Sequence, residues 1–178
     1  EADGWNPVEW HHLHHTFGGA TYNDGSRDLY LTGVQRHGVA DNGWIIEEPT
    51  QFNYQWLPNR SDVDPDDGPA MWHGRVPRVT APLGGTTDIE YGQNRPCEED
   101  YSLQYWHTND RDCFPQTVYD GGHRSTGVFN RYLVTEVTED PGSGQAVMST
   151  SYEYEGDPGW GFNVGSFAFY DHYWGWSN

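Results

Sequence analysis

Glycine and proline interrupt this sequence so often that no window of a dozen residues carries an unbroken apolar stripe with helical spacing. The 178 residues include 22 glycines and 11 prolines. Between these interruptions stand short runs of β-branched and aromatic residues, which favour strands. We therefore expect one all-β domain, predominantly antiparallel, built from hairpins and meanders as a β-sandwich or as an open segment of a hairpin shell.

The expected strands follow from two-residue alternation and from the turn signals between the runs. They comprise residues 28–35, 44–47, 50–56, 72–80, 86–91, 132–138, 146–155 and 166–174. The turn signals lie at residues 41–43, 67–69, 84–85, 120–122 and 140–144. Their short spacing favours hairpins over βαβ units.

Residues 78–91, RVTAPLGGTTDIEY, give the clearest local signal. The run Arg78-Val79-Thr80 is β-prone, and residues 87–91 alternate with a period of two. We expect Gly84 and Gly85 to supply the positive φ angles of a tight turn. The segment therefore predicts a β-hairpin that ends in a tyrosine.

This hairpin resembles a YD-repeat unit. Other segments resemble the same family, and they follow one another along the chain in the order found in that family. They are RDLYLTGVQR at 27–36, LPNR at 57–60, FNRYLV at 129–134 and SYEY at 151–154. The resemblance is to RHS/YD-repeat proteins, and more narrowly to the segment upstream of the repeat shell in large secreted proteins of the actinobacterial type. It divides the chain into an N-terminal arm (1–26), an RHS-like segment (27–160) and an aromatic C-terminal strand (161–178).

The resemblance implies a secreted or cell-surface protein whose repeats form a hollow shell around an effector region. The self-cleavage residues of the family lie in a downstream segment that this sequence lacks, so neither protease nor toxin activity is implied. What carries over is a non-catalytic, wall-forming role. Its partners would be the rest of a larger polypeptide or further copies of the chain.

The charge balance limits the partners. With 27 acidic residues against 9 basic ones, all arginine, the formal charge is -18. Such a surface repels nucleic acid and anionic membranes and attracts metal cations. No apolar run approaches the ~20 residues of a membrane span, so we expect no membrane insertion. The start at Glu1 lacks the features of a signal peptide, so we expect a soluble chain or a mature or excised piece.

The two cysteines, Cys97 and Cys113, bracket a polar loop. A disulfide between them would close a loop of ~15 residues and stabilise the fold by ~3 kcal/mol in the chain-entropy model. Two reduced thiols in a cytosolic protein are the alternative. A zinc site is disfavoured, because no CxxC or HxxxC pair accompanies the cysteines.

Two clusters are candidate metal sites. Carboxylates at alternate positions before a glycine are suited to calcium, although solvated turn aspartates are the alternative. These are Asp62, Asp64, Asp66 and Asp67. Closely spaced imidazoles are suited to a transition metal, although histidines are also ordinary polar residues on β-surfaces. These are His11, His12, His14 and His15.

Tryptophan rings can stack on sugar rings, which makes carbohydrate a further candidate partner, with packing between strands as the alternative. The residues in question are Trp44, Trp174 and Trp176. Nothing favours catalysis: carboxylate pairs arise from composition alone, and the sequence contains no GxSxG, phosphate loop or HExxH motif. The strand-forming run at 166–170 has one apolar face, which predicts pairing with further strands or with a second copy.

Overall fold

The structure is a computed structural model, and it describes residues 8–18, 28–40, 43–63, 71–97, 109–120, 123–155, 160–162 and 174–176. These residues form antiparallel strands and loops, which confirms the all-β prediction. Within these ranges no helix has the length and apolar character needed to cross a membrane.

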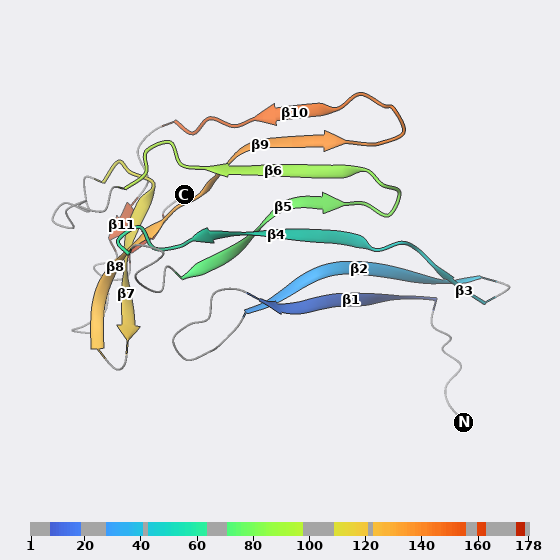
Figure 1. Ribbon diagram of the computed structural model, residues 1–178, viewed down its shortest axis with the longest axis horizontal. Coiled ribbons are helices and arrows are strands. Elements are labelled where there is room, and N and C mark those ends of the chain that lie inside the picture. Colours follow the sequence, from blue (N-terminus) through green and yellow to red (C-terminus); the bar gives the residue numbers. More distant parts are fainter. Residues whose placement is uncertain are drawn as a thin grey trace.

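Eight strands form one open antiparallel sheet. Seven of them follow the order β1-β2-β4-β5-β6-β9-β10, and the eighth, β3, pairs with β2 on the same side as β4 does. Figure 1 shows this main sheet as a single layer with β1 and β10 at opposite edges. Its strands are β1 (Glu9–Gly18), β2 (Asp28–Ala40), β3 (Gly43–Ile46), β4 (Thr50–Pro58), β5 (Trp72–Thr80), β6 (Thr86–Gly92), β9 (Leu133–Asp140) and β10 (Met148–Ser151).

Two short hairpins complete the described strands. One pairs β7 (Cys113–Asp120) with β8 (His123–Asn130), and the other pairs β11 (Trp160–Phe162) with β12 (Trp174–Trp176). The strand predictions omitted β1, β7, β8 and β11. Of the expected strand at 166–174, only Trp174 lies within the described residues.

The hairpin predicted at residues 78–91 is present as β5, a turn and β6. Gly84 adopts a φ of 89° and donates its N–H to the carbonyl of Ala81 at 2.9 Å. The expectation that Gly85 would also adopt a positive φ is wrong. A Cβ on Gly85 would lie 3.2 Å from the carbonyl oxygen of Asp140, so this glycine serves a close approach between two turns.

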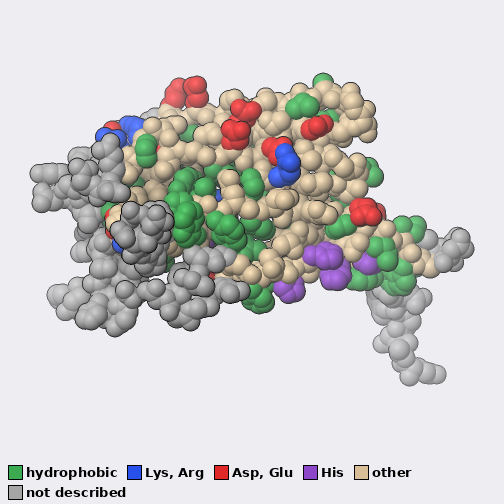
Figure 2. Space-filling model, viewed as in Figure 1, with side chains coloured by type: hydrophobic (Ala, Val, Ile, Leu, Met, Phe, Trp, Pro, Cys, Tyr) green, Lys and Arg blue, Asp and Glu red, His purple; other side chains and the backbone are tan. Residues whose placement is uncertain are grey.

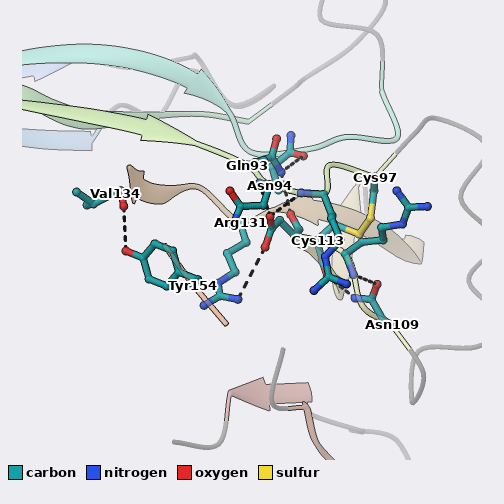
Figure 3. Close-up of polar contacts among 12 residues, drawn as sticks. Gln93, Asn94, Cys97, Asn109, Cys113, Arg131, Val134 and Tyr154 are labelled. Atoms are coloured by element: carbon teal, nitrogen blue, oxygen red, sulfur yellow. Dashed lines mark hydrogen bonds and ion pairs between the residues drawn. A yellow bond between two sulfur atoms is a disulfide. The ribbon is translucent and has the colours of Figure 1, made fainter. Parts of the chain in front are cut away.

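A small core lies where the β7–β8 hairpin meets the main sheet. It contains Val128, Phe129, Leu133 and the disulfide that joins Cys97 to Cys113, whose Cα atoms are 5.9 Å apart. The predicted disulfide is therefore present. Asn109 is buried beside it and donates its side-chain N–H to the Cys113 carbonyl at 2.7 Å (Figure 3).

Polar contacts join this core to the main sheet. The side-chain amide of Asn130 and the hydroxyl of Tyr132 both donate to the carbonyl of Pro58, at 3.0 and 3.1 Å. The carboxylate of Asp112 accepts the backbone N–H groups of Asn94 and Arg95 at 2.7 and 3.0 Å. These contacts attach the end of β4 and the segment after β6 to the β7–β8 hairpin.

Candidate assembly surface

The main sheet buries little of itself. Among its described strand residues, only Gly33, His37 and Leu133 are buried. A single layer has no second layer to cover either face, so apolar side chains remain exposed on both. Large exposed apolar surfaces on soluble proteins commonly mark interaction sites.

Among the described strands, β1 is an unpaired edge of the main sheet. It runs for ten residues without proline or lysine. His14 lies opposite Gly33 and His15 lies opposite Leu31, so the extra residue of the β-bulge, Thr32, is in β2 and β1 stays regular. Natural edge strands are usually short, bulged or charged, because a regular edge pairs readily with another strand.

The opposite edge differs in length. Strand β10 contains four residues and is exposed throughout. It therefore offers a much shorter ladder to an incoming strand than β1 does. Of the two edges of the main sheet, β1 is better suited to pairing.

Alternation along β1 sends its side chains to two faces of the sheet. The ring face is defined by Trp10, His12 and His14 of β1, His37 of β2 and Trp44 of β3. The arginine face is defined by Glu9, His11, Leu13, His15 and Phe17 of β1 and Arg36 of β2. The four histidines proposed as a metal site are thus divided into two pairs.

On the ring face, aromatic and imidazole rings stack. Trp10 stacks on His37 with ring centroids 3.7 Å apart and meets Trp44 edge-on at 6.2 Å. His12 stacks on His14 at 4.3 Å with an interplanar angle of 15°. The Nε2 atoms of His14 and His37 are buried, and neither has a hydrogen-bond partner among the described residues. A buried unpaired nitrogen costs ~1–3 kcal/mol, so these atoms call for a physical explanation.

On the arginine face, Arg36 connects three segments. It donates to Glu9 in β1 at 2.8 Å and to Glu47 after β3 at 3.3 Å. The hydrogen bond and charge of Glu9, with the charge of Glu47, raise the pKa of Arg36 above its ordinary value. These contacts hold β1 in register with β2.

Apolar side chains surround these polar groups. On the arginine face, Leu13 and Phe17 are 55% and 62% exposed, and Leu29, Leu31 and Ile45 are exposed nearby. On the ring face, Trp10, Val39, Trp44 and Ile46 are exposed. Figure 2 shows histidine and hydrophobic side chains gathered over this end of the sheet. We name this end, β1 to β3 with both its faces, the assembly surface.

The structure divides the predicted histidine site between two faces and describes only part of the other predicted sites. In the segments that the structure describes, no three or more histidine, cysteine, aspartate or glutamate side chains are arranged to hold a metal ion. Asp62 is engaged by Arg60, while Asp64, Asp66 and Asp67 lie outside the described residues. The calcium site therefore stays a prediction.

The tryptophans proposed for carbohydrate binding belong to two different sheets. Trp44 is half-exposed on the ring face, whereas Trp174 and Trp176 belong to β12, of which only the backbone is described. The sequence analysis missed β1 itself. The signal for this strand was that Trp10, His12 and His14 alternate with Leu13. Histidine is polar, so the alternation does not appear as one apolar and one polar face.

Comparisons of the chain with protein-family models, with curated proteins and with solved structures found no match.

Proposed function

We propose that this chain is a non-catalytic structural segment of a secreted or cell-surface β-scaffold of the RHS/YD-repeat kind. In this role the main sheet is one stretch of a wall, and further strands extend it at its edges. The partners are the rest of a larger polypeptide or, as a second candidate, further copies of this chain.

One observation carries this proposal: the main sheet is a single open layer with exposed apolar side chains on both faces. A wall needs this arrangement, because its faces and edges are completed by neighbouring segments. The second candidate, assembly from copies, is favoured by the regular, ten-residue edge of β1.

Two further features support the proposal. The motif at 78–91 is a hairpin within the main sheet, and the motif at 27–36 falls almost wholly in β2. The disulfide between Cys97 and Cys113 is typical of oxidising compartments, in agreement with secretion.

Charging the edge tests this role. In the double variant Leu13→Lys/Phe17→Lys, two exposed apolar residues of β1 become charged, as in natural edge strands that resist pairing. We expect the parent chain, kept in chelator, to sediment as associated species and to bind a hydrophobic dye. The double variant should be monomeric and bind less dye.

The control is Leu83→Lys, because Leu83 is 96% exposed in the β5–β6 turn, away from the assembly surface. It should behave as the parent does. A parent chain that is monomeric at every concentration and binds no dye would overturn the proposed role.

A further inference from the structure

We propose that two copies of this chain pair antiparallel through β1, centred on Leu13, and that the pairing creates a four-histidine site for a divalent transition metal such as Zn²⁺. The ligands are His12 and His14 of one copy and the same two residues of the second copy. This inference rests on the proposed role of β1 as a pairing edge, and it names the partner and the ion.

The register follows from symmetry. Two identical strands related by a two-fold axis normal to the sheet must place residues of the same face opposite each other. Centring the axis on Leu13 pairs residues 9–17 of each copy, which is nearly all of β1. It also sets the exposed side chain of Leu13 against its own counterpart, where both are removed from water.

This register also suits the charges. Glu9 is the only carboxylate in β1. It would lie opposite Phe17 of the second copy, and the two Glu9 residues would be ~26 Å apart at ~3.3 Å per residue. That separation exceeds the Debye length of ~8 Å at physiological salt, so the edge itself adds little to the repulsion between two acidic chains.

In the same register, His12 lies opposite the second copy's His14, and His14 lies opposite the second copy's His12. Directly opposed Cβ atoms are ~5 Å apart, and positions two apart along a strand are ~6.6 Å apart. Four imidazoles therefore surround one point on the ring face. Four nitrogen ligands at ~2.0–2.1 Å are what tetrahedral zinc requires.

One copy alone does not form this site. His12 and His14 stack nearly parallel, with ring centroids 4.3 Å apart, so their in-plane lone pairs run side by side and do not converge on one ion. Rotation of the rings toward the second copy would make them converge. Coordination would also give a partner to the buried Nε2 of His14, which has none among the described residues.

The other face supplies a matched control. On the arginine face, His11 would lie opposite the second copy's His15. The two such pairs are separated by Leu13 and its counterpart, ~13 Å along the strand, so only two imidazoles meet at each point. The pairing therefore predicts zinc binding by His12 and His14, and not by His11 and His15.

Sedimentation velocity of the tag-free chain tests this inference, first in chelator and then with zinc added in steps. We expect zinc to lower the dissociation constant of the dimer at least tenfold, with saturation at one ion per two chains and reversal by chelator. Cobalt should give the absorption spectrum of a tetrahedral site. The variant His12→Ala/His14→Ala should lose all these responses, whereas His11→Ala/His15→Ala should keep them.

Thermal melts of both variants verify that they fold. Sedimentation that does not respond to zinc, or an equal response in the His12→Ala/His14→Ala variant, would overturn the metal site. If chains in chelator still associate through β1 and zinc has no effect, this inference fails while the proposed scaffold role stands. If the Leu13→Lys/Phe17→Lys variant also associates as the parent does, both the metal site and the proposed scaffold role fail.

Discussion

Arg60 donates two hydrogen bonds to the carboxylate of Asp62, from Nε to Oδ1 at 2.9 Å and from Nη2 to Oδ2 at 2.8 Å. Burial of the Asp62 carboxylate acts to raise its pKa, but hydrogen bonds from Arg60 and from the backbone of Val128 outweigh it, and the net pKa lies below the ordinary value. The pair thus helps to join the chain after β4 to β8. It also occupies the oxygens that a calcium ion at Asp62 would need.

Without this ion pair, the free energy of unfolding should depend less on pH in the acid range. Because the folded-state pKa of Asp62 is lowered, its stabilising effect is fully present above the unfolded-state pKa of about 3.9 and is lost as the pH falls through the folded-state pKa. We expect Asp62→Asn to lower the free energy of unfolding at neutral pH by about 1 kcal/mol after allowance for solvent screening. Urea unfolding should show this difference shrinking below about pH 4. A difference that is constant with pH would contradict it.

Removal of the disulfide should destabilise the fold. The bridge joins residues 16 apart in sequence, and the chain-entropy model gives about 3 kcal/mol for a loop of about this size. We expect the double variant Cys97→Ser/Cys113→Ser to lose that much unfolding free energy in denaturant titrations. Intact mass with and without reductant should differ by two hydrogen atoms. Two alkylatable thiols in the native protein would refute the disulfide.

Gly74 should not tolerate a side chain. A Cβ there would lie 2.7 Å from Cε1 of Tyr30 and 3.0 Å from Cδ1 of Tyr54. Because the ring of Tyr30 also packs edge-on against Trp56, it has little freedom to move. We expect Gly74→Ala to cost about 1–3 kcal/mol, measured as a lower Tm.

The matched control for that substitution is Gly38→Ala. Gly38 is also a strand glycine, but a Cβ there would meet no atom within 4 Å. The control should leave the Tm unchanged or slightly higher, since alanine restricts the unfolded chain. Equal effects of the two substitutions would show that crowding at Gly74 is not the cause.

Calcium binding at the Asp62–Asp67 loop is open to a direct test. A ligand that binds only the folded state raises Tm by mass action. Calcium bound at this loop should raise the parent Tm, chelator should lower it again, and Asp64→Asn/Asp66→Asn should abolish the response. Identical melts in calcium and chelator would leave a solvated turn as the explanation.

The sequence by itself determined part of the local structure. Gly84, Gly142 and Gly144 adopt the positive φ angles that mark the turns around β5–β6 and β9–β10, and the β-prone runs between turn signals became strands. The cysteine pairing was also predictable, because only Cys97 and Cys113 are present. These features depend on residues close in sequence, whose conformational preferences are local.

Only the tertiary structure decided which strands are neighbours and which side chains are left exposed. Strand β6 pairs with β9 and not with β7, and Asn130 and Tyr132 reach the carbonyl of Pro58 more than seventy positions away. The same long-range pairing makes β1 an edge and places His12 beside His14 on the ring face. Periodicity fixes the face on which a side chain lies, but contacts between distant segments decide what covers that face.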